Sequence, residues 1–225
     1  MYIIPAIKDM KRLIIALSVL YCFASACSSA PEVTGKIDIY EDFQSKFIAS
    51  RTVRVWTPSD YDPHKKYDVI YMHDGQNLFD ASITWNGEEW GVDETLSHLN
   101  AEGKIRPCIV VGMDCGTLRY EEYYPSKICQ NIPEGCLPED FTPLGDEYLR
   151  FIVEEVKPFI DGKYSTWGDA AHTFVSGSSC GGLISSYALC EYPEVFSGAA
   201  CLSTHSNLWN PHTDKDQTPA ADAYR

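Results

Sequence analysis

The alternation of hydrophobic and polar positions predicts a sheet that begins with an antiparallel strand. Polar and apolar residues alternate over 51–57 and the alternation stops at Pro58, a pattern typical of a half-buried strand. Short, nearly unbroken apolar runs over 67–72 and 107–113 indicate parallel strands that are covered on both faces. Two further strands are predicted over 173–176 and 198–202.

Helical periodicity separates these strands. Helices are predicted over 92–100, 146–160 and 182–190, and Pro158 is expected to kink or end the second, because proline lacks the N–H that a helix interior uses. Strands that alternate with helices predict an α/β fold, with a mixed, mostly parallel sheet wrapped by helices. In such folds ligands bind at the carboxyl ends of the parallel strands.

The segment 177–181 reads Gly-Ser-Ser-Cys-Gly, a G-x-S-x-G pattern, and lies between a predicted strand and a predicted helix. This pattern occurs by chance in Gly/Ser-rich loops, but a strand before it and a helix after it are typical of a nucleophile elbow. Gly177 and Gly181 lack the side chains that would keep strand and helix apart. The pattern therefore predicts Ser179 as a nucleophile.

An oxyanion hole beside such a serine needs two hydrogen-bond donors. We assign the backbone N–H of Cys180 to the first, and the backbone N–H of Gln76, in the loop after strand 67–72, to the second. The alternative for this loop is an ordinary β-turn. For the side chains of His73 and Asp74 we favour a structural role, in which they are hydrogen-bonded to backbone.

Composition and charge limit the classes of partner. With 44% hydrophobic and 22% charged residues, the chain resembles a globular protein and neither a disordered nor a polytopic membrane protein. Eighteen Lys and Arg against 32 Asp and Glu give a formal net charge of −14. Such a surface repels phosphate backbones, so nucleic acid is excluded as a partner and a neutral or cationic ligand is favoured.

The first 26 residues have the parts of an export signal. Basic residues precede an apolar run over 13–24, which is too short to span a bilayer, and small residues then lead to Cys27. The small-small-Cys junction resembles a bacterial lipobox, so lipidation of Cys27 is favoured over simple secretion. We therefore predict a signal peptide over 1–26, a tether over 27–36 and one domain over 37–225. The protein is expected to be a periplasmic or outer-membrane lipoprotein, or secreted, with a lipid anchor as its one membrane attachment.

The cysteines of an exported chain can oxidise. Cys129 and Cys136 bracket a loop that contains Pro and Gly, and they are the pair that we predict to form a disulfide. The cysteine spacings contain no C-x-x-C pair and no histidine at finger-like distance, so we predict no zinc site and no other metal site.

Two motifs together with a third segment resemble a known family. These are Tyr71-Met-His-Asp-Gly-Gln-Asn-Leu-Phe79, Gly177-Ser-Ser-Cys-Gly-Gly-Leu183 and Tyr192-Pro-Glu-Val-Phe196. They resemble the "putative esterase" family related to esterase D, which includes feruloyl and acetyl-xylan esterases, enterochelin esterases and S-formylglutathione hydrolase. The resemblance implies an α/β-hydrolase fold, a serine acyl-enzyme mechanism without a cofactor, and a feruloyl or acetyl ester carried on carbohydrate. It also maps the second oxyanion donor onto Gln76, and the family usually has Met at the position of Cys180.

No histidine after Ser179 in the sequence fits the role of triad base, and no acid there fits the role of its orienting partner. The histidines that follow are His205 and His212. Neither fits, because His205 follows a strand at once and His212 lies in a polar, turn-rich stretch that precedes the last acids. The resemblance implies that relatives continue with an Asp and then a His. We therefore expect this chain to be a fragment that lacks the triad Asp and His, the last strands and the C-terminal helix, and to have little activity.

Two readings compete with an esterase. The first is a non-catalytic exported lipoprotein that binds glycans through aromatic side chains in predicted loops. These aromatic residues are Trp85, Trp90, Tyr120, Tyr123 and Tyr124. The second is a truncated gene product without activity.

Overall fold

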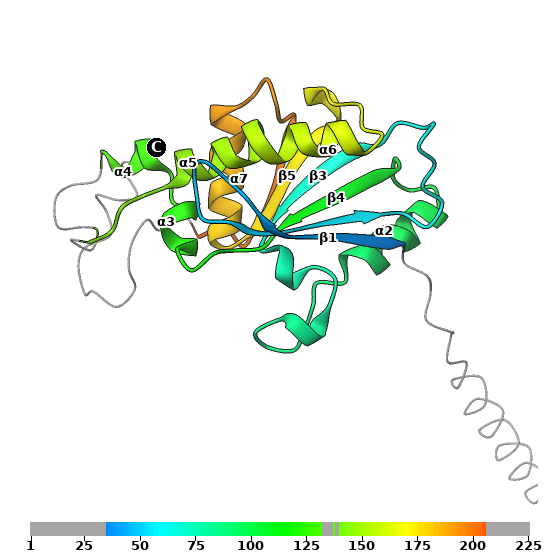
Figure 1. The fold of residues 1–225 in the computed structure, drawn as a ribbon, viewed down its shortest axis with the longest axis horizontal. Coiled ribbons are helices and arrows are strands. Elements are labelled where there is room, and N and C mark those ends of the chain that lie inside the picture. The colour runs from blue at the N-terminus through cyan, green and yellow to red at the C-terminus, as the bar shows by residue number, and fades with distance from the viewer. Residues whose placement is uncertain (1–34, 132–136, 138–139, 206–225) are drawn as a thin grey trace, which may run out of the picture. The chain divides into compact units, whose positions relative to one another are not determined.

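A computed structural model describes residues 35–131, 137 and 140–205 (Figure 1). Within this part of the chain, six strands form one sheet in the order β1-β2-β4-β3-β5-β6. β1 pairs antiparallel with β2, and β2 pairs antiparallel with β4, whereas β4, β3, β5 and β6 are parallel. The strands are β1 (Lys36–Phe43), β2 (Arg51–Thr57), β3 (Asp68–His73), β4 (Cys108–Met113), β5 (Thr173–Ser178) and β6 (Gly198–Leu202).

The predicted α/β fold and its mixed sheet are confirmed. The buried runs became β3 and β4, and all six residues of β4 are buried, as expected for a strand covered on both faces. The sequence prediction missed β1, which alternates polar and apolar residues from Lys36 to Tyr40 and pairs along most of β2. The strand that was predicted as the first of the domain, over 51–57, is therefore the second, β2.

Helices cover both faces of the sheet (Figure 1). The α-helices are α2 (Val92–Ala101), α3 (Arg119–Tyr123), α4 (Ser126–Cys129), α5 (Gly145–Arg150), α6 (Lys157–Lys163) and α7 (Cys180–Glu191). The other helical segments are the 3-10 turns η1 (Gly75–Asn77), η2 (Ala81–Ile83) and η4 (Ala170–His172) and the π-helix η3 (Phe151–Val156). None of the helices in the described residues is long and apolar enough to cross a membrane.

Two hydrophobic cores lie on the two faces of the sheet. Tyr71 of β3 belongs to the larger core, which α5, η3, α6 and α7 complete. Met72, the next residue, belongs to the smaller core, which packs against α2. Successive residues of a strand point to opposite faces, so this alternation fixes which helices lie on which side of β3.

Pro158 does not end the helical segment, which was one of the two outcomes that the sequence predicted, the other being a kink. It lies in the first turn of α6, directly after the π-helix η3, and the helix continues to Lys163. Proline is tolerated in a first helical turn, because the N–H that it lacks has no partner there in an ordinary helix. The switch from α5 through η3 to α6 thus accommodates Pro158 without a break in the helical segment.

Several predictions fall on residues that the structure does not describe. The signal peptide 1–26, Cys27 and nearly all of the tether 27–36 lie outside the described residues, and β1 begins at Lys36. Cys129 is a buried thiol in the structure, and its predicted partner Cys136 lies outside the described residues. The export signal, the lipidation and this disulfide stay predictions.

Candidate active site

Ser179 forms a one-residue turn between β5 and α7. β5 ends at Ser178 and α7 begins at Cys180, so the turn is tighter than the pattern had suggested. Ser179 has φ 58° and ψ −120°, a conformation that non-glycine residues rarely adopt and that clusters at functional sites. Its side chain is exposed at the carboxyl end of a parallel strand. This geometry is that of a nucleophile elbow.

The backbone of Ser179 is held on both sides. Its N–H donates to Leu202 O of β6 at 2.9 Å, and its carbonyl oxygen accepts from Gly182 N–H at 3.1 Å and from His205 N–H at 3.0 Å. These bonds join the turn to the neighbouring strand and to the first turn of α7. They stabilise a conformation that is otherwise unfavourable.

The two glycines of the motif differ in how strictly the fold requires them. A Cβ on Gly177 would lie 2.6 Å from the carbonyl carbon and oxygen of Gly181, which are backbone atoms that cannot move away. A Cβ on Gly181 would lie 3.4 Å from the Cβ of His73 and 3.5 Å from Asp74 Oδ2. Gly177 therefore sets how closely strand and helix approach, and the loop after β3 lies against the elbow.

The loop after β3 presents a backbone donor beside the elbow. Asp74 adopts a left-handed conformation with φ 57°, and its carbonyl oxygen accepts from Asn77 N–H at 2.9 Å. Gly75 packs on β4, because a Cβ there would lie 2.7 Å from the carbonyl carbon of Gly112. Within the described residues, the N–H groups of Gln76 and Cys180 donate to no other group. Both N–H groups that the sequence prediction assigned thus have no acceptor in the described residues, and their role as oxyanion donors stays a prediction.

The side chain of Gln76 is clamped to the loop after β4. Its Oε1 accepts from Cys115 N–H at 3.0 Å, and its Nε2 donates to Cys115 Sγ at 3.1 Å. Two hydrogen bonds to one residue fix the amide, so the backbone of Gln76 is held in place through its own side chain.

The sequence favoured side-chain hydrogen bonds from His73 and Asp74 to backbone, but in the described part of the chain both side chains bond to other side chains. His73 is fully buried, and its Nδ1 shares a hydrogen bond with Tyr148 Oη at 2.8 Å. Burial lowers the pKa of His73 to about 4, so the ring is neutral at neutral pH. Asp74 pairs with Arg119 through two hydrogen bonds of 2.6 and 2.8 Å. Both residues have structural roles, but their partners are side chains far away in the sequence.

Two more arginine–carboxylate pairs support the same region. Arg51 binds Glu122 through two hydrogen bonds of 2.9 and 2.7 Å, and both side chains are only 2% exposed. Arg54 binds Asp114 through two hydrogen bonds of 2.8 Å. Each pair joins β2 to the segment that follows β4. Paired arginines therefore hold the loops that surround the elbow, and local sequence patterns do not reveal them.

The thiol of Cys180 lies among these groups. Burial raises the pKa of this thiol, while the charge of Arg119 acts in the opposite direction.

Within the described residues, the hydroxyl of Ser179 has no hydrogen bond to a His, Asp or Glu side chain that could act as its base. The backbone of His205 bonds to Ser179 O, but its ring lies 6.4 Å from the ring of Tyr124, measured between centroids. His212 lies outside the described residues. The described residues also contain no group of three or more His, Cys, Asp or Glu that could hold a metal ion.

The aromatic residues considered for sugar stacking divide into two sets. Trp85 and Tyr120 are 88% and 60% exposed. Tyr123, the last residue of α3, and Tyr124, which follows it, are buried in the larger core, so neither is available for stacking. Trp90 is 37% exposed and lies at an apolar groove.

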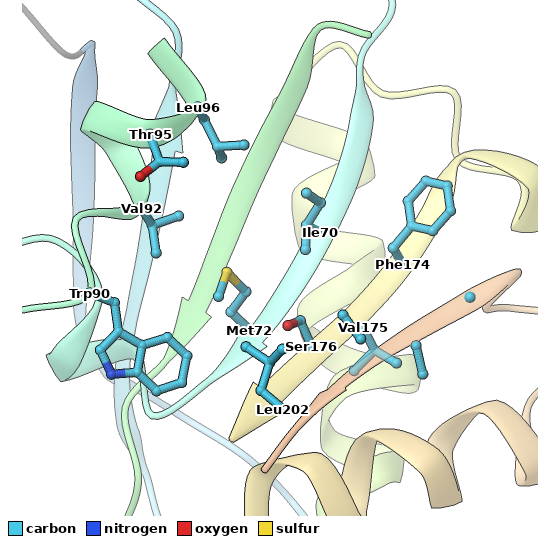
Figure 2. A pocket seen from close by; sticks show the side chains of 13 residues that line it. Ile70, Met72, Trp90, Val92, Thr95, Leu96, Phe174, Val175, Ser176 and Leu202 are labelled. Carbon is cyan, nitrogen blue, oxygen red and sulfur yellow. The ribbon is translucent and has the colours of Figure 1, made fainter. Parts of the chain in front are cut away.

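This groove of about 590 Å³ lies on the α2 side of the sheet. Figure 2 shows side chains of β3, β5, β6 and α2 around it, among them Ile70, Met72, Leu96 and Leu202, together with Trp90 from the segment before α2. None of its lining residues carries a titratable side chain. The groove offers apolar contact and no catalytic group.

Comparisons with known proteins agree with the fold and the motif. Residues 45–225 match the model of the family described as "Putative esterase". Protein YjcH of Bacillus subtilis (strain 168), described as uncharacterized, is 26% identical over 183 residues, which are 80% of this chain and 64% of that protein.

Two solved structures share the fold. An IroE-like serine hydrolase from Shewanella oneidensis has a TM-score of 0.60 at 23% identity and is matched over 84% of this chain and 56% of its own. A ferulic acid esterase has a TM-score of 0.56 at 21% identity, over 84% and 65%. This chain thus spans less than two thirds of each of these three proteins. From the family match and the α/β-hydrolase-type sheet, we conclude that the chain belongs to the "Putative esterase" family.

Proposed function

We propose that the chain carries the nucleophile and oxyanion hole of a serine carboxylic-ester hydrolase. The observation that supports this most strongly is the strained, exposed Ser179 at the N-terminus of α7. The backbone N–H groups of Gln76 and Cys180 have no acceptor in the described residues. A helix N-terminus favours negative charge, which is what develops on an ester carbonyl oxygen under attack.

In the proposed reaction the Oγ of Ser179 attacks the ester carbonyl carbon and its proton passes to a base. The carbonyl oxygen becomes an oxyanion, which accepts hydrogen bonds from the N–H groups of Gln76 and Cys180. The tetrahedral intermediate collapses, the alcohol leaves with a proton, and the acyl group remains on Ser179 until water releases the acid. No step needs a cofactor.

The base is the weak part of this site. The backbone N–H of His205 bonds to Ser179 O, but within the described residues no hydrogen bond joins its ring to the hydroxyl of Ser179. We therefore expect residues 1–225 to turn over esters slowly, because an oxyanion hole and binding without the complete triad leave about 10³–10⁴-fold over water.

For the substrate we propose an ester of a neutral carbohydrate, with a feruloyl or acetyl acyl group. The net charge of −14 disfavours anionic substrates. Trp85 and Tyr120 are exposed aromatic side chains, which suit stacking on sugar or phenolic rings. One similar structure is named as a ferulic acid esterase. We also propose export and lipidation at Cys27, which loss of fatty-acid labelling in Cys27→Ser would test.

The experiment is covalent labelling by a fluorophosphonate, which reacts with activated serines. Because Ser179 has no hydrogen bond to a base in the described residues, we expect slow labelling of the wild-type chain and none of Ser179→Ala. Ser178→Ala is the matched control, since Ser178 is the neighbouring, partly exposed serine at the end of β5. Label that persists in Ser179→Ala, or a chain that binds xylan without ever being labelled, would contradict the proposal.

A further inference from the structure

The ion pair of Asp74 and Arg119 lies between the two parts of the candidate oxyanion hole. Arg119 Nε donates to Asp74 Oδ1 at 2.6 Å and Nη2 donates to Oδ2 at 2.8 Å, so the pair is bidentate. Asp74 is only 3% exposed. A buried carboxylate needs a partner, and a bidentate guanidinium fixes both its charge and the plane of its oxygens.

On one side, this pair determines the conformation of the loop after β3. Asp74 is the left-handed residue with which the η1 turn begins, and Gln76 lies two residues further on. The N–H of Asp74 donates to Tyr123 Oη at 3.2 Å. Arg119 and Tyr123 are four residues apart in α3, and the guanidinium lies 4.9 Å from the centre of the Tyr123 ring. One short helix therefore holds both the backbone and the side chain of Asp74.

On the other side, the pair touches the beginning of α7. Asp74 Oδ2 lies 3.5 Å from the position that a Cβ on Gly181 would occupy. The positive charge of Arg119 also favours the ionised form of the Cys180 thiol, and the N–H of Cys180 is the other candidate donor. A negative charge at this point would repel a developing oxyanion, and Arg119 neutralises it.

We infer that Arg119 is a positioning residue for ester hydrolysis: through Asp74 it sets the Gln76 donor against the Cys180 donor and cancels the carboxylate charge beside the oxyanion. This inference rests on the proposed function. Arg119 does not need to touch the substrate, because its effect passes through Asp74 and the two loops that the pair joins.

The test measures the rate constant with which a fluorophosphonate labels Ser179, by intact-protein mass spectrometry, in a set of variants. The labelled state carries a phosphoryl oxygen in the oxyanion hole, so its formation depends on the two donors. Arg119→Met leaves Asp74 buried and unpaired, and we expect labelling to slow about 100-fold, the size of effect found when an oxyanion donor is lost. Arg119→Lys keeps the charge but loses the fork, and we expect about a tenfold decrease.

Two further readouts separate positioning from a general loss of structure. Asp74→Asn combined with Arg119→Met removes the unpaired charge, so labelling should be faster than in Arg119→Met alone. Low-millimolar guanidinium should restore part of the labelling rate of Arg119→Ala. The matched control is Arg106→Met, which removes the ion pair of Arg106 with Asp68 at the opposite end of β3 and should label like the wild type.

The labelling rates of these variants distinguish failure of the inference about Arg119 from failure of the proposed function. If Arg119→Met is folded and labels at the wild-type rate, the inference is wrong while the proposed function stands. If Arg119→Met does not fold, Arg119→Lys and Asp74→Asn decide, and wild-type rates in both would overturn it. If the wild type and Arg106→Met are never labelled, the proposed function itself fails, and with it this inference.

Discussion

Acid should destabilise this domain through one buried imidazole. His73 is fully buried beside the elbow, its Nδ1 is bonded to Tyr148, and its Nε2 has no partner in the described part of the chain. Burial is the main reason that its pKa falls from 6.5 to about 4, with Arg119 adding to the decrease and Asp74 opposing it. Between these two pH values His73 is protonated in the unfolded chain and neutral in the folded protein.

The sign and size of the effect follow from this difference. The folded state holds His73 in its neutral form. The contribution of His73 to the free energy of unfolding is therefore fully present above pH 6.5 and decreases as the pH falls towards 4. The loss between pH 7 and pH 5 is about 2 kcal/mol, since one pKa unit corresponds to about 1.4 kcal/mol. It approaches about 3 kcal/mol at pH 4.

The assay is urea unfolding of the wild type and of His73→Asn at pH 7 and pH 5. Asparagine does not titrate and can still bond Tyr148, so the variant should lose about 2 kcal/mol less than the wild type over this range. His98→Asn is the control for the loss of an imidazole outside the core, because the side chain of His98 on α2 is 67% exposed. Equal losses in the wild type and His73→Asn would refute the reasoning.

Two further predictions concern packing and charge. Gly177→Ala should lower the free energy of unfolding in urea by about 1–3 kcal/mol and slow the labelling of Ser179, because the new Cβ would clash with the backbone of Gly181. The control is Gly162→Ala in α6, where the new Cβ meets open space, and it should raise the free energy of unfolding by up to about 1 kcal/mol. A harmless Gly177→Ala would contradict the proposed closeness of strand and helix. Arg51→Met should cost about 3–5 kcal/mol because it leaves Glu122 buried without its partner, and Arg51→Met with Glu122→Leu should cost less, which a thermal melt of both variants would check. If the double variant proves the less stable of the two, the argument from an unpaired buried charge is wrong.

The parts of the fold that local sequence determines were predicted within a few residues. β3 and β4 have unbroken apolar runs that suit a covered strand, and the elbow has glycines at the two positions where strand and helix meet. α3 and α4 were missed, since five and four residues are too few for helical periodicity to show. The π-helical switch before Pro158 was also missed, because the rule for proline in a helix interior does not anticipate it.

The ion pairs between residues far apart in the chain could not be predicted from the sequence. Arg119 lies 45 residues from Asp74, and Arg51 lies 71 residues from Glu122. Nothing in a local pattern says which arginine meets which carboxylate, since only the order of strands in the sheet brings these segments together. The sequence located the candidate donors of the oxyanion hole, and the fold shows what holds them.

The most direct test of the account is peptide mapping of the fluorophosphonate adduct by mass spectrometry. The account predicts that the adduct is found on the peptide that contains Ser179, that it forms slowly in residues 1–225, and that Ser179→Ala abolishes it. An adduct on another serine of the wild type, or none after long incubation of a folded chain, would contradict the central claim that Ser179 is the nucleophile.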